Sequence, residues 1–223
     1  MILGLLARQY QLWAVLVLSP SAWTVASYPL LLRGLVDGLI ALAWIARNPT
    51  MAGPFKVYSA GRLKLLAEHW RMGGDPEEKW QLAYAEELEE LANDEQWIHL
   101  LPIELGSWNG KDIRTMAIEA DLKSLYDVAY SPLSAEAHAE WMVLRRRFLK
   151  RCGEPSHKAH WLPVFQRPFL HTGVPQVATG YFLMVVEEAF AALGLEHDAD
   201  LWNQTFRAVV DASEKIEASH RPH

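Results

Sequence analysis

The stretch PLLLRGLVDGLIALAW, residues 29–44, decides the fold class, because apolar residues occupy almost every side of the helix that it would form. A helix that is apolar all round is buried among other elements, so this segment is expected to be central. It is predicted to end at Asn48-Pro49, since a proline disfavours helical backbone at the preceding residue. The stretch from Ile2 to Leu18 is also apolar all round and is predicted to be a second central helix.

Helical periodicity and capping residues recur along the rest of the chain, whereas no stretch alternates with the period of a strand. The clearest start is DPEE, residues 75–78, which supplies an N-cap, a first-turn proline and an acidic first turn. A helix is predicted to begin at Pro76 and to fold back against a basic helix over 55–72. Further helices are predicted over residues 111–120, from there to 130, and over 131–151, 176–193 and 199–218. The predicted fold is all-α, a single-domain bundle of about seven to nine helices over residues 1–223.

The composition describes a globular protein, because 51% of its 223 residues are hydrophobic and ten are tryptophans. The formal net charge of -6 argues against binding nucleic acid by global attraction, so any such binding requires a local basic patch. The single cysteine, Cys152, excludes an internal disulfide framework and fits a reducing compartment. A cytoplasmic protein is expected.

The N-terminal region requires a test for membrane insertion, because no charge occurs between Arg8 and Arg33. That span is long enough to cross a bilayer. However, Pro20 and Pro29 interrupt it, and Ser19-Pro20 is typical of a helix end. We therefore predict two buried helices and no membrane contact.

The only charges in the central stretch are Arg33 and Asp37, which lie four residues apart and share a helix face. A buried charge is costly unless it is paired, so a bridge between them or a shared polar partner is predicted. Gly34 and Gly38 lie beside them and leave room for another backbone or a ligand. The alternative to a functional site is a buried ion pair that fixes helix packing.

His138 stands out in the second half of the chain. Ser131-Pro132 is predicted to start a helix at a hinge, and that helix would place His138 on one stripe with Trp141. An inward-facing histidine near a helix end can act as a base or as a hydrogen-bond anchor. The alternative is a core histidine that is satisfied by a hydrogen bond. If the central helix packs against the hinge, one polar cluster would contain Arg33, Asp37, Tyr130 and His138.

Other chemistry-bearing residues give weaker signals. His157 and His160 lie in a loop rich in proline and histidine over 154–175, but two histidines without a placed carboxylate or cysteine are poor evidence for a metal site. Cys152 is interpreted as a packing residue. Neither a metal nor a cofactor is predicted, and the sequence contains no glycine-rich phosphate loop, serine elbow or Cys-His nucleophile pair.

The segments LLLRGLVDGLIALAWIARNP (30–49) and LYDVAYSPLSAEAHAEW (125–141) resemble a bacterial family of helical domains of unknown function. Its members share an Arg-x-x-[Glu/Asp] helix, matched here by Arg33 and Asp37 with one more residue between them. They also share a Tyr-x-x-Leu-Ser-x-x-x-His segment, matched here by Tyr130, Leu133, Ser134 and His138. The family's acid is more typically glutamate, so Asp37 is a shortened version. The resemblance marks residues without naming a reaction.

The candidate functional residues form two sets. The candidate catalytic residues are Arg33, Asp37 and His138. The candidate binding residues are Tyr126, Tyr130, Ser134 and Trp141.

A more distant resemblance is to the higher-eukaryote and prokaryote nucleotide-binding helical domains, several of which are ribonucleases in toxin or phage-defence systems. Their signature is an arginine and a histidine a few residues apart, matched here by Arg151 and His157, although Gly153 and Pro155 between them break a helix. The resemblance implies that the arginine would stabilise charge developing on a phosphate and the histidine would accept a proton.

Three hypotheses follow, and the sequence leaves open whether the protein is an enzyme. The first is a small effector with Arg33, Asp37 and His138 around a pocket, acting on or binding phosphate-containing ligands such as RNA or nucleotides, in stress or phage defence. The second is a noncatalytic helical module that recognises a partner protein or a second copy, with a purely structural polar cluster. The third is a protein anchored to a membrane through residues 9–32.

Overall fold

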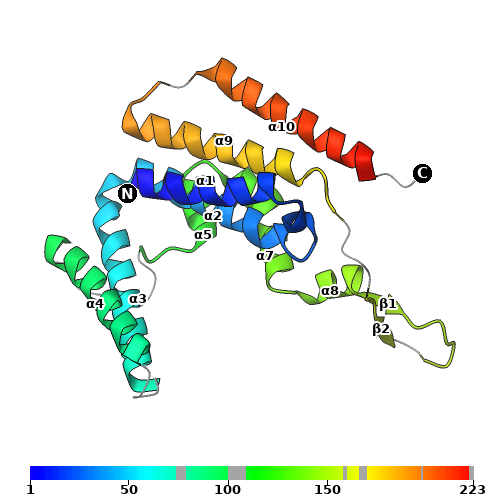
Figure 1. The fold of residues 1–223 in the computed structure, drawn as a ribbon, viewed down its shortest axis with the longest axis horizontal. Coiled ribbons are helices and arrows are strands. Elements are labelled where there is room, and N and C mark those ends of the chain that lie inside the picture. Colours follow the sequence, from blue (N-terminus) through cyan, green and yellow to red (C-terminus); the bar gives the residue numbers. More distant parts are fainter. Residues whose placement is uncertain (74–78, 100–108, 158–159, 166–169, 197, 221–223) are drawn as a thin grey trace. The chain divides into compact units, whose positions relative to one another are not determined.

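The chain is almost entirely helical (Figure 1), which confirms the predicted all-α class. The computed structural model describes residues 1–73, 79–99, 109–157, 160–165, 170–196 and 198–220. It contains two compact units, which are residues Met1–Ala46 with Ala117–His223, and residues Arg47–Met116. That the chain forms a single domain stays a prediction.

The core of the first unit is built around α2 (Tyr28–Arg47), together with α1 (Ile2–Leu18), η1 (Pro20–Trp23) and α9 (Val174–Leu193). Two buried clusters follow each other along α2. The first contains Leu16, Ala22, Trp23, Leu32, Leu35, Val174 and Ala178. The second contains Leu39, Leu42, Val185 and Ala189. Because α2 contributes to both clusters, its predicted central position is confirmed. The same prediction is wrong for α1, in which only Gln9 and Leu16 are buried and Leu3 and Leu18 are exposed.

The two glycines of α2 allow α1 to pack closely. A Cβ atom at Gly34 would lie 3.2 Å from Cδ1 of Leu12, and one at Gly38 would overlap the side-chain amide of Gln9. Side chains of α1 thus fill the space that the missing Cβ atoms leave. The room expected beside Arg33 and Asp37 is taken by another helix.

Two further long helices of this unit, α9 and α10 (Ala199–His220), form a pair. As expected from the sequence, α9 ends at Gly194, whose φ of 66° lies in the left-handed region that glycine favours. α9 is joined to α1 by a hydrogen bond of 3.0 Å from Nε1 of Trp13 to Oγ1 of Thr179. Phe182 stacks on the same tryptophan, with ring centroids 4.9 Å apart.

The predicted hinge before Ser131 is wrong, because the backbone stays helical through it. α6 (Lys123–Leu125) continues through η3 (Tyr126–Tyr130), a π-helical turn, into α7 (Ser131–Ala137). The amide of Ser131 donates to the carbonyl of Tyr126, five residues earlier. A proline inside an α-helix clashes with the carbonyl four residues before it, and the wider π turn gives Pro132 that room.

The predicted helix over 131–151 is also wrong, because α7 stops at His138. The amide of Ala139 donates to the carbonyl of Glu136 and the amide of Glu140 to that of Ala135, which is the Schellman pattern. Ala139 adopts a φ of 51° at the position where glycine is usual, so the end of the helix could not be predicted from the residue type.

A short helix and a hairpin replace the rest of that predicted helix (Figure 1). The helix is α8 (Trp141–Arg147). It leads into β1 (Leu149–Arg151), which pairs antiparallel with β2 (Trp161–Pro163). These strands lie partly in the predicted loop over 154–175.

The second unit contains η2 (Pro49–Met51), α3 (Ala52–Gly73) and α4 (Lys79–His99), and α5 (Ile113–Glu119) begins within it. The predicted hairpin of a basic and an acidic helix is confirmed: α3 packs on α4 through Ala67, Ala85 and Leu88, and Arg71 forms an ion pair with Glu89. The predicted start at Pro76 lies outside the described residues.

Two helices among the described residues are long and apolar enough to cross a membrane, α2 and α9. Within the tested windows, 61% of α2 and 33% of α9 is buried inside the protein. Core helices of soluble proteins have the same length and composition, so these features do not assign a location. The cytoplasmic location and the absence of membrane contact stay predictions.

Candidate functional site

Arg33 and Tyr130 join α2 to the π-helical turn. Nη2 of Arg33 donates a hydrogen bond of 3.2 Å to the hydroxyl of Tyr130, and its guanidinium carbon lies 5.4 Å from the centroid of that ring. Tyr126 stacks on Tyr130 with ring centroids 5.1 Å apart. Tyr130 is only 8% exposed. The contact expected between the central helix and this segment is therefore present.

Asp37 lies near this pair but does not take the hydrogen bond of Arg33. Burial raises the pKa of the Asp37 carboxyl, while the positive charges of Arg33 and Arg8 lower it in part. The pKa of the Arg33 guanidinium is raised chiefly by its hydrogen bond to Tyr130. Nε of Arg33 is buried without a hydrogen-bond partner in the part of the chain that is described. Arg33 is thus linked directly to Tyr130, and Asp37 interacts with Arg33 only through its charge.

His138 does not point into the core, which corrects the predicted orientation. It is the C-cap residue of α7 and is exposed, because the helix that would have turned it inward ends there. Trp141, expected on the same stripe, is 55% exposed. Ser134 is half-buried on α7, and its carbonyl accepts a hydrogen bond from the amide of His138.

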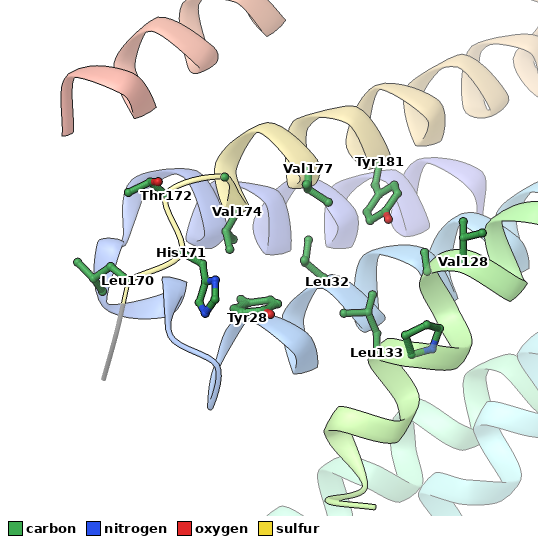
Figure 2. Close-up of a pocket in the computed structure, with 13 residues that line it drawn as sticks. Tyr28, Leu32, Val128, Leu133, Leu170, His171, Thr172, Val174, Val177 and Tyr181 are labelled. Carbon is green, nitrogen blue, oxygen red and sulfur yellow. The ribbon is translucent and has the colours of Figure 1, made fainter. Parts of the chain in front are cut away.

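A cavity of about 460 Å³ lies between α2, the start of α9 and the segment η3–α7 (Figure 2). Its wall includes Tyr28, Leu32, Leu133, His171, Thr172 and Tyr181. His171 lies against Tyr28 with ring centroids 5.1 Å apart. Neither Arg33 nor His138 is among the residues that line this cavity. The pocket predicted around those two residues is therefore not this one.

The electrostatics of the cavity favour neutral groups. Burial lowers the pKa of His171, and the positive charge of Arg147 lowers it further, whereas Glu136 opposes this effect. Arg147 and Glu136 form an ion pair of 2.7 Å. Burial also raises the pKa of Tyr181. The cavity therefore presents an uncharged imidazole and a phenol among apolar side chains.

His171 is recognisable in the sequence as a third histidine of the predicted loop over 154–175, but its place in a cavity could not be predicted, because that place depends on contacts distant in sequence. The amide of His171 donates to the carbonyl of Trp23 at 2.8 Å, and the preceding Leu170 forms an isolated β-bridge with Thr24. Gly173, the N-cap residue of α9, and the first-turn Pro175 are local signals that this histidine lies close to a helix start.

A second surface gathers basic and aromatic side chains on α8 and the hairpin, residues 141–157 and 160–165, which we name the arm. Its exposed basic residues are Arg145, Arg146, Lys150 and Arg151. None of the four forms an ion pair with a described carboxylate, whereas Arg147 is bound to Glu136. The guanidinium carbon of Arg145 lies 4.9 Å from the ring centroid of Trp161. Phe165 is 94% exposed.

Three side chains with metal-binding atoms also meet in the arm. Sγ of Cys152 lies 3.7 Å from Nδ1 of His157, and Nδ1 of His160 lies 3.3 Å from the same nitrogen. One ligand atom from each residue falls within 4.8 Å of the others. Cys152, predicted to be a packing residue, instead lies beside the two histidines.

The sequence profile of the Family of unknown function (DUF5677) matches residues 1–156. The chain belongs to this family. The DUF5677 match contains Arg33, Asp37, Tyr130 and His138, and it ends before His157. It confirms the expected membership of a family of unknown function, whereas the bacterial origin and the distant likeness to nucleotide-binding domains stay predictions. No curated protein and no solved structure matches this DUF5677 chain.

Proposed function

We propose that the protein binds single-stranded RNA through the arm. The observation that carries this proposal is the set of four exposed basic side chains that no described carboxylate neutralises. Lysine and arginine bind phosphates, and exposed aromatic rings such as Trp141 and Phe165 provide surfaces on which unpaired bases stack. The formal net charge of -6 restricts this attraction to the arm.

The finer form of the proposal is cleavage of the bound RNA by Arg151 and His157. Arg151 lies on β1 and His157 in the loop that follows, so both belong to the arm. The arginine would stabilise charge on the phosphate, and the histidine would accept the proton of the attacking hydroxyl. Action in the cytoplasm, in stress or phage defence, belongs to the same proposal.

The polar cluster on α2 is assigned to packing in this proposal. Arg33 is held by a hydrogen bond and a ring contact to the buried Tyr130, which supports a structural role for Arg33 and Asp37. His138 is exposed and does not join them. Substituting Arg33 is therefore expected to lower stability and to leave RNA affinity unchanged. The noncatalytic alternative also predicts the loss of stability, because it assigns the cluster a structural role.

Fluorescence anisotropy with a labelled oligouridine, measured over a series of KCl concentrations, tests the proposal. The double variant Arg146→Glu/Lys150→Glu should bind the oligouridine at least about tenfold more weakly, which is a loss of about 1.4 kcal/mol in binding free energy. In a plot of the logarithm of the binding constant against the logarithm of the KCl concentration, the slope should become shallower by about 1.4 if two phosphate contacts are lost. Phe165→Ala should weaken binding by about 1–3 kcal/mol without changing that slope.

The matched control is Arg207→Glu/Lys215→Glu on α10, which changes the net charge by the same amount at two exposed positions. Its affinity should stay within about twofold of wild type, since distant charges are screened beyond about 10 Å in 0.1 M salt. Equal losses in the two double variants would show that only the overall charge matters. No binding by the wild-type chain at low salt would reject the proposal outright.

A further inference from the structure

The end of the hairpin places Cys152 and His160 opposite each other. The ladder pairs Arg151 with Trp161, and the next residues continue it through a hydrogen bond of 2.9 Å from the amide of Cys152 to the carbonyl of His160. Residues directly opposite in an antiparallel pair point to the same face. The thiol and the imidazole therefore start on one side of the hairpin.

The loop between these two residues returns a third donor to the same side. The amide of His157 donates a hydrogen bond of 3.0 Å to the carbonyl of Glu154, which closes a turn. This turn brings Nδ1 of His157 close to both other groups, at 3.7 Å from Sγ of Cys152 and 3.3 Å from Nδ1 of His160. Three donors from separate backbone positions thus converge on one point.

Two of the three separations match edges of a zinc coordination tetrahedron, and the third is within 4.8 Å. With Zn–S and Zn–N bonds of about 2.3 Å and about 2.05 Å, tetrahedral angles give S···N and N···N separations of about 3.6 Å and about 3.3 Å. The two observed distances, 3.7 Å and 3.3 Å, agree with these values. We propose that Cys152, His157 and His160 form a binding site for Zn²⁺.

The donor set also has the right chemistry. Thiolate and imidazole are the ligands that zinc takes most often, and three protein ligands leave a fourth position for water or another ligand. When the Zn–S bond forms, the thiol of Cys152 releases its proton to solvent, and both histidines bind in their neutral form through Nδ1. Zn²⁺ binding should therefore release a proton. This proposal does not rest on RNA binding, and it excludes the cleavage role of His157, because an imidazole bound to Zn²⁺ through Nδ1 has no free nitrogen to accept a proton.

Titration of the full chain with Zn²⁺ and Co²⁺ tests the site without reference to any activity. One Zn²⁺ per chain should bind, and Co²⁺ should give the intense visible bands of a tetrahedral ion together with a thiolate-to-cobalt charge-transfer band. Cys152→Ser should abolish the charge-transfer band. His157→Ala and His160→Ala should each weaken Zn²⁺ binding at least about tenfold, the lower end of the loss expected for disturbing a metal site.

The matched control is His138→Ala, which removes an exposed histidine of the same unit that is not part of the cluster. It should bind Zn²⁺ like wild type, and circular dichroism should show the same helix content for all four variants. An equal loss in His138→Ala, or a Co²⁺ spectrum without the charge-transfer band, would overturn the proposal. So would wild-type affinity in His157→Ala and His160→Ala, because the histidines would then be joined only by hydrogen bonds.

Discussion

The side-chain amide of Gln9 on α1 occupies the space that a Cβ atom would fill at Gly38 on α2. Gln9 is fully buried, and neither Nε2 nor Oε1 has a hydrogen-bond partner among the described residues. An unpaired polar group in the interior costs free energy, because water would otherwise have satisfied it. The contact between α1 and α2 therefore contains a buried polar group that weakens the fold.

Replacing this amide with an apolar group of similar length should stabilise the protein. Gln9→Met is expected to raise the free energy of unfolding by about 1–3 kcal/mol, the cost of one unsatisfied buried group. Urea denaturation measures the change. The control is Gln11→Met, an exposed position on the same helix, which should change stability by less than about 0.5 kcal/mol. A less stable Gln9→Met protein would mean that the amide is satisfied in solution.

Gly38→Ala should destabilise the protein although alanine is the better helix former. Its Cβ would collide with the amide of Gln9, and overpacking of this kind costs about 1–3 kcal/mol. In a Gln9→Ala background the same change should become nearly neutral. Gly180→Ala on α9, where no atom lies within 4 Å of the added Cβ, should instead stabilise by about 0.5–1 kcal/mol. Identical effects at both glycines would contradict the packing argument.

The link between Arg33 and Tyr130 should appear as a coupling energy. Tyr130→Phe removes the hydroxyl that accepts the hydrogen bond and leaves the ring contact, so a loss of about 1–2 kcal/mol is expected. In an Arg33→Met background the same substitution should cost clearly less. Tyr126→Phe, on the stacked neighbour, serves as the control and should cost under about 0.5 kcal/mol. Additive losses in the double variant would show that the two side chains do not interact.

Asp37→Asn should stabilise the protein at pH 7. Burial raises the pKa of Asp37 above its unfolded value, so its favourable contribution is complete below about pH 3.9 and is lost as pH rises through the folded pKa. The asparagine cannot ionise and avoids that loss. The difference in unfolding free energy between variant and wild type should therefore shrink toward acid pH. A variant that is less stable at pH 7 would mean that attraction to Arg33 and Arg8 outweighs burial.

The contribution of His171, the histidine in the cavity, to stability should change with pH in the opposite direction to that of Asp37. Burial and Arg147 lower the pKa of His171, so the unfolded chain takes up the proton first. Its contribution to stability is present above about pH 6.5 and is lost as pH falls from there through the lowered pKa of the folded state. His171→Asn should remove this part of the acid loss when urea curves at pH 5 and pH 8 are compared. If His171→Asn has the same pH dependence of stability as wild type, the imidazole of His171 is solvated in the folded protein.

The long helices could be predicted from the sequence because local signals and packing agree there. α1 has the predicted bounds, and Gly194 ends α9 as its position suggested. The region after Tyr130 could not be predicted, because Ala139 takes a backbone conformation that is typical of glycine. A helical stripe drawn through that residue placed His138 inside, whereas it is exposed.

Residues of the candidate site could be predicted from the sequence only where their positions depend on the face of a single helix. Arg33 and its neighbours were found because two charges in an apolar helix need a partner, and Tyr130 is that partner. Cys152 and His160 were not combined, since their meeting depends on a strand register that their short, irregular sequence does not reveal. His171 depends on a hydrogen bond to Trp23, far away in the chain.

The π-helical turn over Tyr126–Tyr130 makes the length of this segment as important as its composition. Each residue of an α-helix turns the chain by about 100°, so deleting one residue here would rotate Tyr130 away from Arg33. It would also press Pro132 against the preceding turn. Homologous chains should therefore exchange side chains here more readily than they gain or lose a single residue.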